Sequence, residues 1–198
     1  MLAAAALLAA LLAVIDTVPY VRDILRGTTR PQRATWLIWS VLGVAAFAAQ
    51  AASGPNWSLV MIGSEACVMV LIFVLAIPHG EGGLRPIDLT MLCLAGLGLV
   101  GWAIVDEPVV ATMFVVVADA IGLGLMVPKT VRDPQSETLS TFVLASVSGV
   151  LGAIAVGRLD QALLLYPVYY ALGNGVLATI IWTARRRSPP SARTVAHA

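Results

Sequence analysis

The sequence predicts an all-α integral membrane protein in which seven transmembrane helices form two parallel three-helix repeats joined by a linker helix (3+1+3). Hydrophobic residues make up 59% of the 198 residues and charged residues only 12%, with a mean hydropathy of +0.90. This balance is typical of membrane proteins. Seven apolar runs are long enough to cross a bilayer, and the second half of the chain repeats polar residues of the first half at a constant spacing.

The predicted spans follow from a hydrocarbon core about 30 Å thick, which a helix of about 20 residues crosses. The N-terminal run lacks the basic segment and the cleavage site of a signal peptide, so we expect it to remain as the first span. Very short links at Pro55-Asn56 and Asp106-Glu107 predict two tight antiparallel hairpins. The spans cover approximately residues 2–21, 34–54, 57–78, 87–105, 108–127, 138–157 and 161–183.

The basic residues predict the orientation of these spans. Eleven of the twelve Lys and Arg residues fall on one side of the membrane, and only Arg158 falls on the other. Because Lys and Arg concentrate in cytoplasmic loops, we expect a multi-pass protein of the cell (inner) membrane with its N-terminus outside and its C-terminus in the cytoplasm. Arg185, Arg186 and Arg187 precede Ser-Pro-Pro, which indicates the end of the last span and a cytoplasmic tail, 185–198.

A register shift of 103 residues superposes the two halves of the chain without a gap. The polar and proline matches are Asp16 with Asp119, Arg26 with Lys129, Pro31-Gln32 with Pro134-Gln135 and Thr35 with Thr138. Matches of this kind arise by accident less readily than matches among Ala, Leu and Val. Since three helices return the chain to the opposite side, a fourth must precede a parallel repeat. The predicted units are a first repeat (1–86), a linker helix (87–106) and a second repeat (107–184).

The layout and the stretch VPYVRDILRGTTRPQRATW resemble the SWEET and PQ-loop superfamily of membrane transporters, in particular its uncharacterised bacterial branch. In this stretch Pro19 is followed by a turn with basic residues and Thr, and the second half carries the similar KTVRDPQSETLSTF. The chain departs from the family motif at Tyr20, where the family places Gln, and at Gly122, where the matching proline is replaced. Parallel repeats of this kind enclose a solute path. The resemblance therefore implies a small-solute transporter that works by alternating access.

Asp16 and Asp119 are the most conspicuous polar residues within the spans. An ionisable group inside a bilayer costs about 2.5–3.5 kcal/mol on insertion scales and normally faces the bundle interior. Their equivalent positions predict similar depths on opposite sides of the repeat axis. We expect them to bind the substrate or a coupling proton, Asp16 at the site or the inner gate. The alternative is a structural role in which the carboxylate bonds a helix end or a basic residue such as Arg22.

Asn174 lies midway along the last span, between glycines that allow helices to approach closely. The resembled family places a substrate-binding Asn in the third helix of each repeat, which implies this role for Asn174, although its partner in register is Leu71. Polarity in the other half would then come from Glu65, Ser64 and Gln50. The alternatives are an interhelical hydrogen bond for Asn174 and a Glu65–Gln50 bond that holds a hairpin.

Aromatic residues provide the remaining candidates. Trp57 and Trp182 stand at span ends and are expected at the membrane interface. Trp36 and Trp39 share one helical face and form either such an anchor or an aromatic wall of the solute path.

Tyr166 and Tyr170 precede Asn174 at four-residue steps on one face of the last span, which suits either a sugar or amino-acid site or a packed helix interface. The residues predicted to bind substrate are Asp119, Asn174, Asp16, Trp36, Trp39 and Tyr170.

Four prolines, Pro19, Pro31, Pro128 and Pro134, flank the loops on the basic side. Proline removes a backbone donor and bends or ends a helix. We interpret these residues as hinges of a gate, as markers of span ends, or as both.

The sequence offers no chemistry for an enzyme. His79 and His197 lie outside the spans, Cys67 and Cys93 are expected to be ordinary core residues, and no metal-ligand spacing appears. We expect no catalytic residue, cofactor, metal site or nucleic-acid partner. The expected partners are a small-molecule solute and the lipid bilayer, and homo-oligomer formation stays open. The competing hypothesis is a non-transporting multi-span membrane protein that serves as a binding or scaffolding component.

Overall fold

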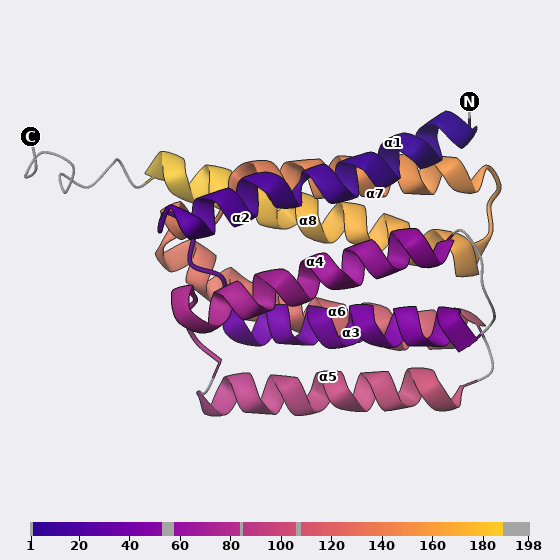
Figure 1. The fold of residues 1–198 in the computed structure, drawn as a ribbon, viewed down its shortest axis with the longest axis horizontal. Coiled ribbons are helices and arrows are strands. Elements are labelled where there is room, and N and C mark those ends of the chain that lie inside the picture. The colour runs from indigo at the N-terminus through magenta and orange to yellow at the C-terminus, as the bar shows by residue number, and fades with distance from the viewer. Residues whose placement is uncertain (1, 53–57, 84, 106–107, 188–198) are drawn as a thin grey trace, which may run out of the picture.

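The computed structural model describes residues 2–52, 58–83, 85–105 and 108–187, and these residues fold into a helical bundle (Figure 1). The elements are α1 (Leu2–Ile15), α2 (Thr17–Leu25), α3 (Arg33–Ala52), α4 (Ser58–His79), α5 (Pro86–Ile104), α6 (Pro108–Arg132), the short 3-10 helix η1 (Pro134–Ser136), α7 (Leu139–Val156) and α8 (Gln161–Arg187). Because α1 and α2 meet at Asp16 and follow one line, the α-helices in the described part of the chain form seven rods.

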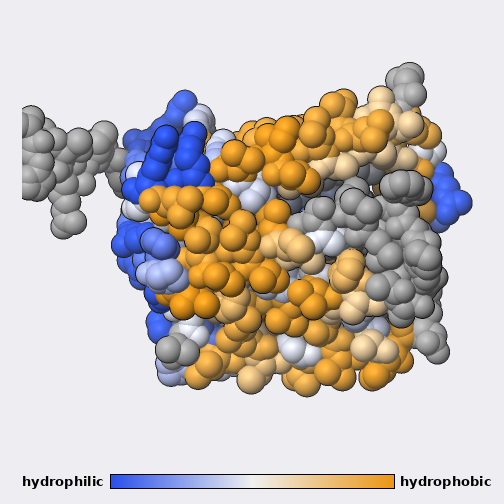
Figure 2. Space-filling model, viewed as in Figure 1, coloured by the Kyte–Doolittle hydropathy of each residue, from blue (hydrophilic) through white to orange (hydrophobic). Residues whose placement is uncertain are grey.

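The rods suit a bilayer in length and in surface. Five segments are long and apolar enough to cross a membrane, and two shorter apolar segments belong to α3 and α4. The five are Leu2–Leu25, Pro86–Ile104, Thr112–Arg132, Leu139–Val156 and Leu163–Arg187. Figure 2 shows hydrophobic surface along the shafts, most of the hydrophilic surface at the left-hand end and a smaller hydrophilic patch at the right-hand end. We call the end that holds the basic last turns of α2, α6 and α8 the basic end. The chain is therefore a membrane-embedded, multi-pass helical protein.

The helices pack in a defined order. α1 lies along α7, α7 along α8, and α3 lies between α4 and α6, while α5 packs on α6 at the edge of the bundle. Close approach of α7 and α8 requires Gly149, because a Cβ there would lie 2.6 Å from the backbone nitrogen of Ala171. Small residues permit such contacts between membrane helices.

The larger apolar core lies toward the basic end and joins α2, α3, α4, α6, α7 and α8. Its buried members are Tyr20, Ile24, Trp36, Ile72, Met126, Phe142, Leu177, Ala178 and Ile181. A smaller cluster joins α3, α5 and α6. Cys67 and Cys93 are exposed on the bundle surface, so the expectation that they are core residues is wrong.

Helix ends differ from the predicted spans at the basic end. Pro19 lacks the N–H that the carbonyl of Ile15 would accept, and the helix is interrupted at the preceding Asp16 but continues to Leu25. α6 likewise continues through Pro128 to Arg132. These two prolines therefore do not mark span ends, because the helix continues beyond each.

The last helix extends into the predicted tail, 185–198. Arg185, Arg186 and Arg187 form the last turn of α8. Residues 188–198, Trp57 and the predicted hairpin links at Pro55-Asn56 and Asp106-Glu107 lie outside the described residues.

Candidate functional site

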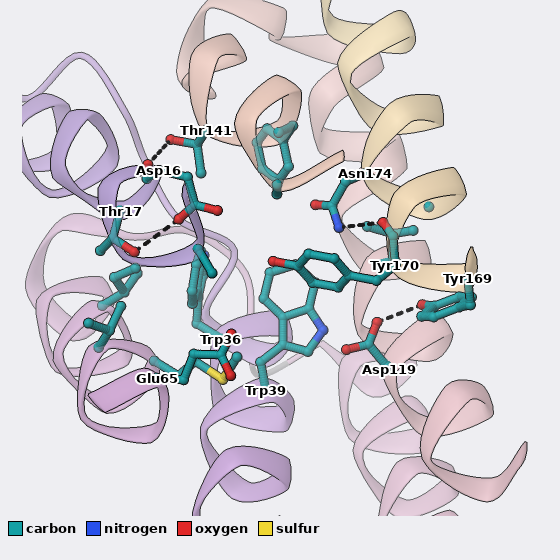
Figure 3. A pocket seen from close by; sticks show the side chains of 18 of the residues that line it. Asp16, Thr17, Trp36, Trp39, Glu65, Asp119, Thr141, Tyr169, Tyr170 and Asn174 are labelled. Atoms are coloured by element: carbon teal, nitrogen blue, oxygen red, sulfur yellow. Dashed lines mark hydrogen bonds between the residues drawn. The ribbon is translucent and has the colours of Figure 1, made fainter. Parts of the chain in front are cut away.

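A cavity of about 70 Å³ lies in the middle of the bundle. Every rod except α5 contributes lining residues from the described part of the chain. All six residues predicted to bind substrate line it: Asp16, Trp36, Trp39, Asp119, Tyr170 and Asn174 (Figure 3). Sequence positions far apart thus meet at one place.

Asp16 stands at the junction of α1 and α2 and is only 6% exposed. The hydroxyl of Thr17 donates to its carboxylate at 3.1 Å, and the hydroxyl of Thr141 donates to its backbone carbonyl at 2.8 Å. Arg22, the basic residue considered as its partner, instead bonds Asp23 at 2.8 Å. The carboxylate of Asp16 therefore belongs to the cavity.

Asp119 lies on α6, across the cavity from Asp16 in the view of Figure 3. The hydroxyl of Tyr169 on α8 donates to its carboxylate at 2.6 Å. Tyr169 is not among the residues predicted from the sequence to bind substrate. Its pairing with Asp119 depends on how α6 and α8 pack, which no local pattern indicates.

Asn174 is 9% exposed and donates from its side-chain nitrogen to the carbonyl of Tyr170, at 2.9 Å. This bond stays within α8, so it holds the amide in place instead of joining two helices. The rings of Tyr166 and Tyr170 stack with centroids 6.0 Å apart. One face of α8 therefore brings two phenols and an amide to the cavity.

Trp36 and Trp39 form an aromatic wall of the cavity, and their ring centroids lie 5.0 Å apart. The indole nitrogen of Trp36 donates to the hydroxyl of Tyr20 at 3.1 Å. That of Trp39 is buried and has no hydrogen-bond partner among the described residues. Trp182 differs, since it is 45% exposed and lies under the guanidinium of Arg186.

Two further cavities extend from the central one, away from the basic end. One of about 310 Å³ lies among α1, α4, α7 and α8, and one of about 250 Å³ lies among α3, α4, α6 and α8. Glu65, Met69 and Tyr166 line all three cavities. The sequence left the role of Glu65 open. In the structure Glu65 lies where the three cavities meet. The side chains of Gln50 and Ser64 lie outside those that the structure describes.

The basic end of the cavity is closed by a buried chain of polar contacts, which we call the seal: Trp36, Tyr20, Glu137 and Lys129. Trp36 donates to Tyr20, the hydroxyl of Tyr20 donates to Glu137 at 2.8 Å, and Glu137 forms an ion pair with Lys129. Lys129 and Glu137 are only 4% and 1% exposed. The first member of the seal is also a wall of the cavity, so the cavity and the seal are directly connected.

Loops from the two halves of the chain meet around the seal. Lys129 donates to the carbonyls of Arg30 and Ser136, and Arg30 forms an ion pair with Asp133. The hydroxyls of Thr29 and Thr138 are 2.7 Å apart. The loop between α2 and α3 is therefore bound to the loop between α6 and α7.

The four predicted hinge prolines lie around this region and line none of the three cavities. Pro19 and Pro128 are within helices. The carbonyl of Pro31 accepts a hydrogen bond from the backbone N–H of Glu81 at 2.9 Å. Pro134 begins η1, and its carbonyl accepts a hydrogen bond from the side-chain Nε of Arg185 at 3.0 Å. None of these four prolines lines the central cavity, so any role in transport would come through movement of the helices.

Comparisons with protein-family models, with curated proteins and with solved structures find no match. The function is therefore inferred from the chemistry and geometry of the cavity.

Proposed function

We propose that the protein is a small-solute membrane transporter that works by alternating access at a midplane site between two repeats. The observation that carries the proposal is the central cavity. Asp16 and Asp119, which are 103 residues apart and match in the repeat register, both line it, and the seal lies at its basic end. Alternating access needs a fixed site whose two entrances open in turn, and the seal has the polar contacts that such a gate would break and remake.

The proposal includes the 3+1+3 arrangement. The first repeat consists of the rod formed by α1 and α2 together with α3 and α4, and the second repeat consists of α6, α7 and α8. A two-fold axis along the membrane normal would exchange the α1–α7 contact with the α6–α3 contact, and both contacts are present. Arg30 and Asp133, 103 residues apart, form an ion pair at the basic end, as equivalent residues near such an axis can. The position of α5 at the edge of the bundle suits a linker helix.

We place the basic end in the cytoplasm of the cell (inner) membrane and the N-terminus outside, because basic residues are retained on the cytoplasmic side. The structure then corresponds to a state closed toward the cytoplasm. Pro19 and Pro128 each leave a helical carbonyl without its usual donor, which makes those helices easier to bend. Together with Pro31 and Pro134 they would serve as hinges when the seal breaks.

The solute is expected to be of sugar or amino-acid type, held by Asp119, Asn174 and the aromatic residues around them. Asp16 and Asp119 are also the groups that would carry a coupled proton, because intramembrane carboxyls that face a solute path serve this role in pumps and transporters.

The test begins with thermal stability in detergent against sugars, amino acids and small metabolites, because a ligand that binds the folded protein raises Tm. A solute that raises Tm is then measured for flux into vesicles that contain the protein. Asp119→Asn is expected to lower this flux at least about tenfold, from the loss of one charged hydrogen bond. Asp160→Asn is the matched control, since Asp160 pairs with Arg158 outside the central cavity.

Binding without flux in either direction would contradict transport and favour the binding or scaffolding component. Undiminished, still pH-sensitive flux in the Asp16→Asn/Asp119→Asn variant would contradict a role for these acids in proton coupling.

A further inference from the structure

We propose that the central cavity takes a small organic cation, an amine or a quaternary ammonium compound. This inference rests on the proposed function, because it concerns the substrate of the same site, and it replaces the expected solute of sugar or amino-acid type by a cationic one. Three carboxylic side chains, Asp16, Glu65 and Asp119, line the cavity, and its lining in the described part of the chain includes no Lys, Arg or His. Acidic side chains therefore reach the cavity from three different rods of the bundle.

None of these three acids forms an ion pair within the residues that the structure describes. The ammonium of Lys129, on the helix that carries Asp119, is already bound to Glu137. Uncompensated carboxylates inside a membrane protein are costly, and they normally pair or mark a substrate or ion path. An occupant with a positive charge would balance what the protein leaves unbalanced.

The geometry disfavours a metal ion as that occupant. In the described ranges no group of three His, Cys, Asp or Glu side chains comes close enough together to hold a metal. Asp16 and Asp119 stand apart in the close-up view (Figure 3), with the aromatic side chains of Trp39 and Tyr170 between them in projection. A larger cation, which contacts several separated walls at once, fits this arrangement better.

Aromatic faces supply the second, independent part of the argument. Indole and phenol rings attract an ammonium group placed within about 6 Å of the ring centroid, and such rings recognise quaternary ammonium ligands. Trp36 and Trp39 provide one wall, and Tyr166, Tyr169 and Tyr170 provide the other. A neutral sugar could stack on the same rings but would leave the carboxylates without a counter-charge, so charge decides between the two classes.

One of the side cavities next to the central cavity is also lined by acidic and aromatic side chains. The side cavity among α3, α4, α6 and α8 is lined by both Glu65 and Asp119, and by Trp39 and Tyr166. A cleft lined by one sign of charge raises the local concentration of the opposite ion. A cation that enters from the end opposite the seal would thus meet two of the three acids before it reaches Asp16.

The experiment measures Tm of the purified full-length chain with choline, tetramethylammonium or ethanolamine at constant ionic strength. The control ligand is 3,3-dimethyl-1-butanol, which has the shape of choline without its charge. At least one cation is expected to raise Tm, and to raise it further as its concentration increases, because the stabilisation follows RT ln(1 + L/Kd), where L is the concentration of free ligand; the neutral alcohol is not expected to do so. In Asp119→Asn the binding of that cation is expected to weaken at least about tenfold, whereas Asp160→Asn should bind as the parent does.

The inference is overturned if none of the three cations stabilises the parent more than the neutral alcohol does, or if Asp119→Asn and Glu65→Gln both bind the cation as the parent does. Glu65→Gln also serves if Asp119→Asn does not fold. Flux of the cation into vesicles separates the two proposals: binding without flux leaves the ligand class standing and contradicts transport. Flux of a neutral solute that no cation inhibits supports transport and contradicts the ligand class.

Discussion

Replacing Glu137 by Gln is expected to lower the free energy of unfolding by about 3–5 kcal/mol, because the substitution leaves a buried ammonium without its counter-charge. Lys129 is 4% exposed and Glu137 is 1% exposed, so water has little access to replace the lost carboxylate. The amide oxygen of Gln can still accept the hydrogen bond from Tyr20, whose hydroxyl lies 2.8 Å from the carboxylate. The other carboxylate oxygen, which accepts from Lys129, is replaced by an NH2 group, so the change removes both the charge and the hydrogen bond of the ion pair while the bond from Tyr20 can remain.

A double-mutant cycle tests this reasoning. Lys129→Met should also cost about 3–5 kcal/mol, since it leaves the carboxylate of Glu137 buried and unpaired. Lys129→Met/Glu137→Gln removes both charges, and its cost should fall below the sum of the two single costs by about 1–3 kcal/mol. The free energies come from reversible unfolding in detergent of increasing SDS content. Additive costs would show that the two groups do not stabilise each other and would refute the argument.

Glu137→Gln also tests whether the seal is a gate. Val68 lines the central cavity, so a Val68→Cys reporter in a Cys67→Ser/Cys93→Ser background reports access to it. A membrane-impermeant thiol reagent is expected to label the reporter from the end opposite the seal. Addition of Glu137→Gln should increase labelling from the basic end. Equal labelling from the basic end with and without Glu137→Gln would contradict the assignment of the seal as the closed gate.

Three further substitutions probe single contacts. Trp36→Phe removes the indole bond that links cavity and seal, and should cost about 1 kcal/mol and increase labelling of the same reporter from the basic end. Tyr169→Phe removes the bond to Asp119 and should lower the free energy of unfolding by about 1.5–3 kcal/mol, whereas Tyr166→Phe, which leaves that bond intact, should cost less; equal costs would contradict a role for the bond. Gly149→Ala should cost about 1–3 kcal/mol through overpacking where α7 and α8 meet, and an unchanged unfolding midpoint would show that the helices separate freely there.

The class of the protein and the approximate positions of its helices could be predicted from the sequence. The length and hydropathy of an apolar run are local properties, and a bilayer leaves the backbone few choices other than a helix. The same constraint explains the main error in the helix ends. Proline ends many helices in water, but α2 and α6 continue past Pro19 and Pro128, where neighbouring helices and side chains can satisfy the freed carbonyl groups.

Part of the candidate site could also be predicted from the sequence, because an acid within an apolar span is conspicuous. The register shift of 103 residues predicted that Asp16 and Asp119 hold matching positions in the two halves. The structure places both in one cavity with Asn174, Tyr170, Trp36 and Trp39; their role in binding stays a prediction. The spacing of residues on a single helix shows which of them share a face, but it does not show which other helix that face meets.

The tertiary structure alone decided which polar groups pair and which end of the cavity is closed. Tyr20 and Glu137 are 117 positions apart, and Asp119 and Tyr169 are 50 apart. Each bond forms only because tertiary packing brings two distant parts of the chain together with the two side chains at the same height and facing each other. The sequence therefore determined that this chain enters a membrane as helices and where its intramembrane acids lie along them. Packing between distant helices determined that Tyr169 bonds Asp119 and that the seal forms beneath the cavity.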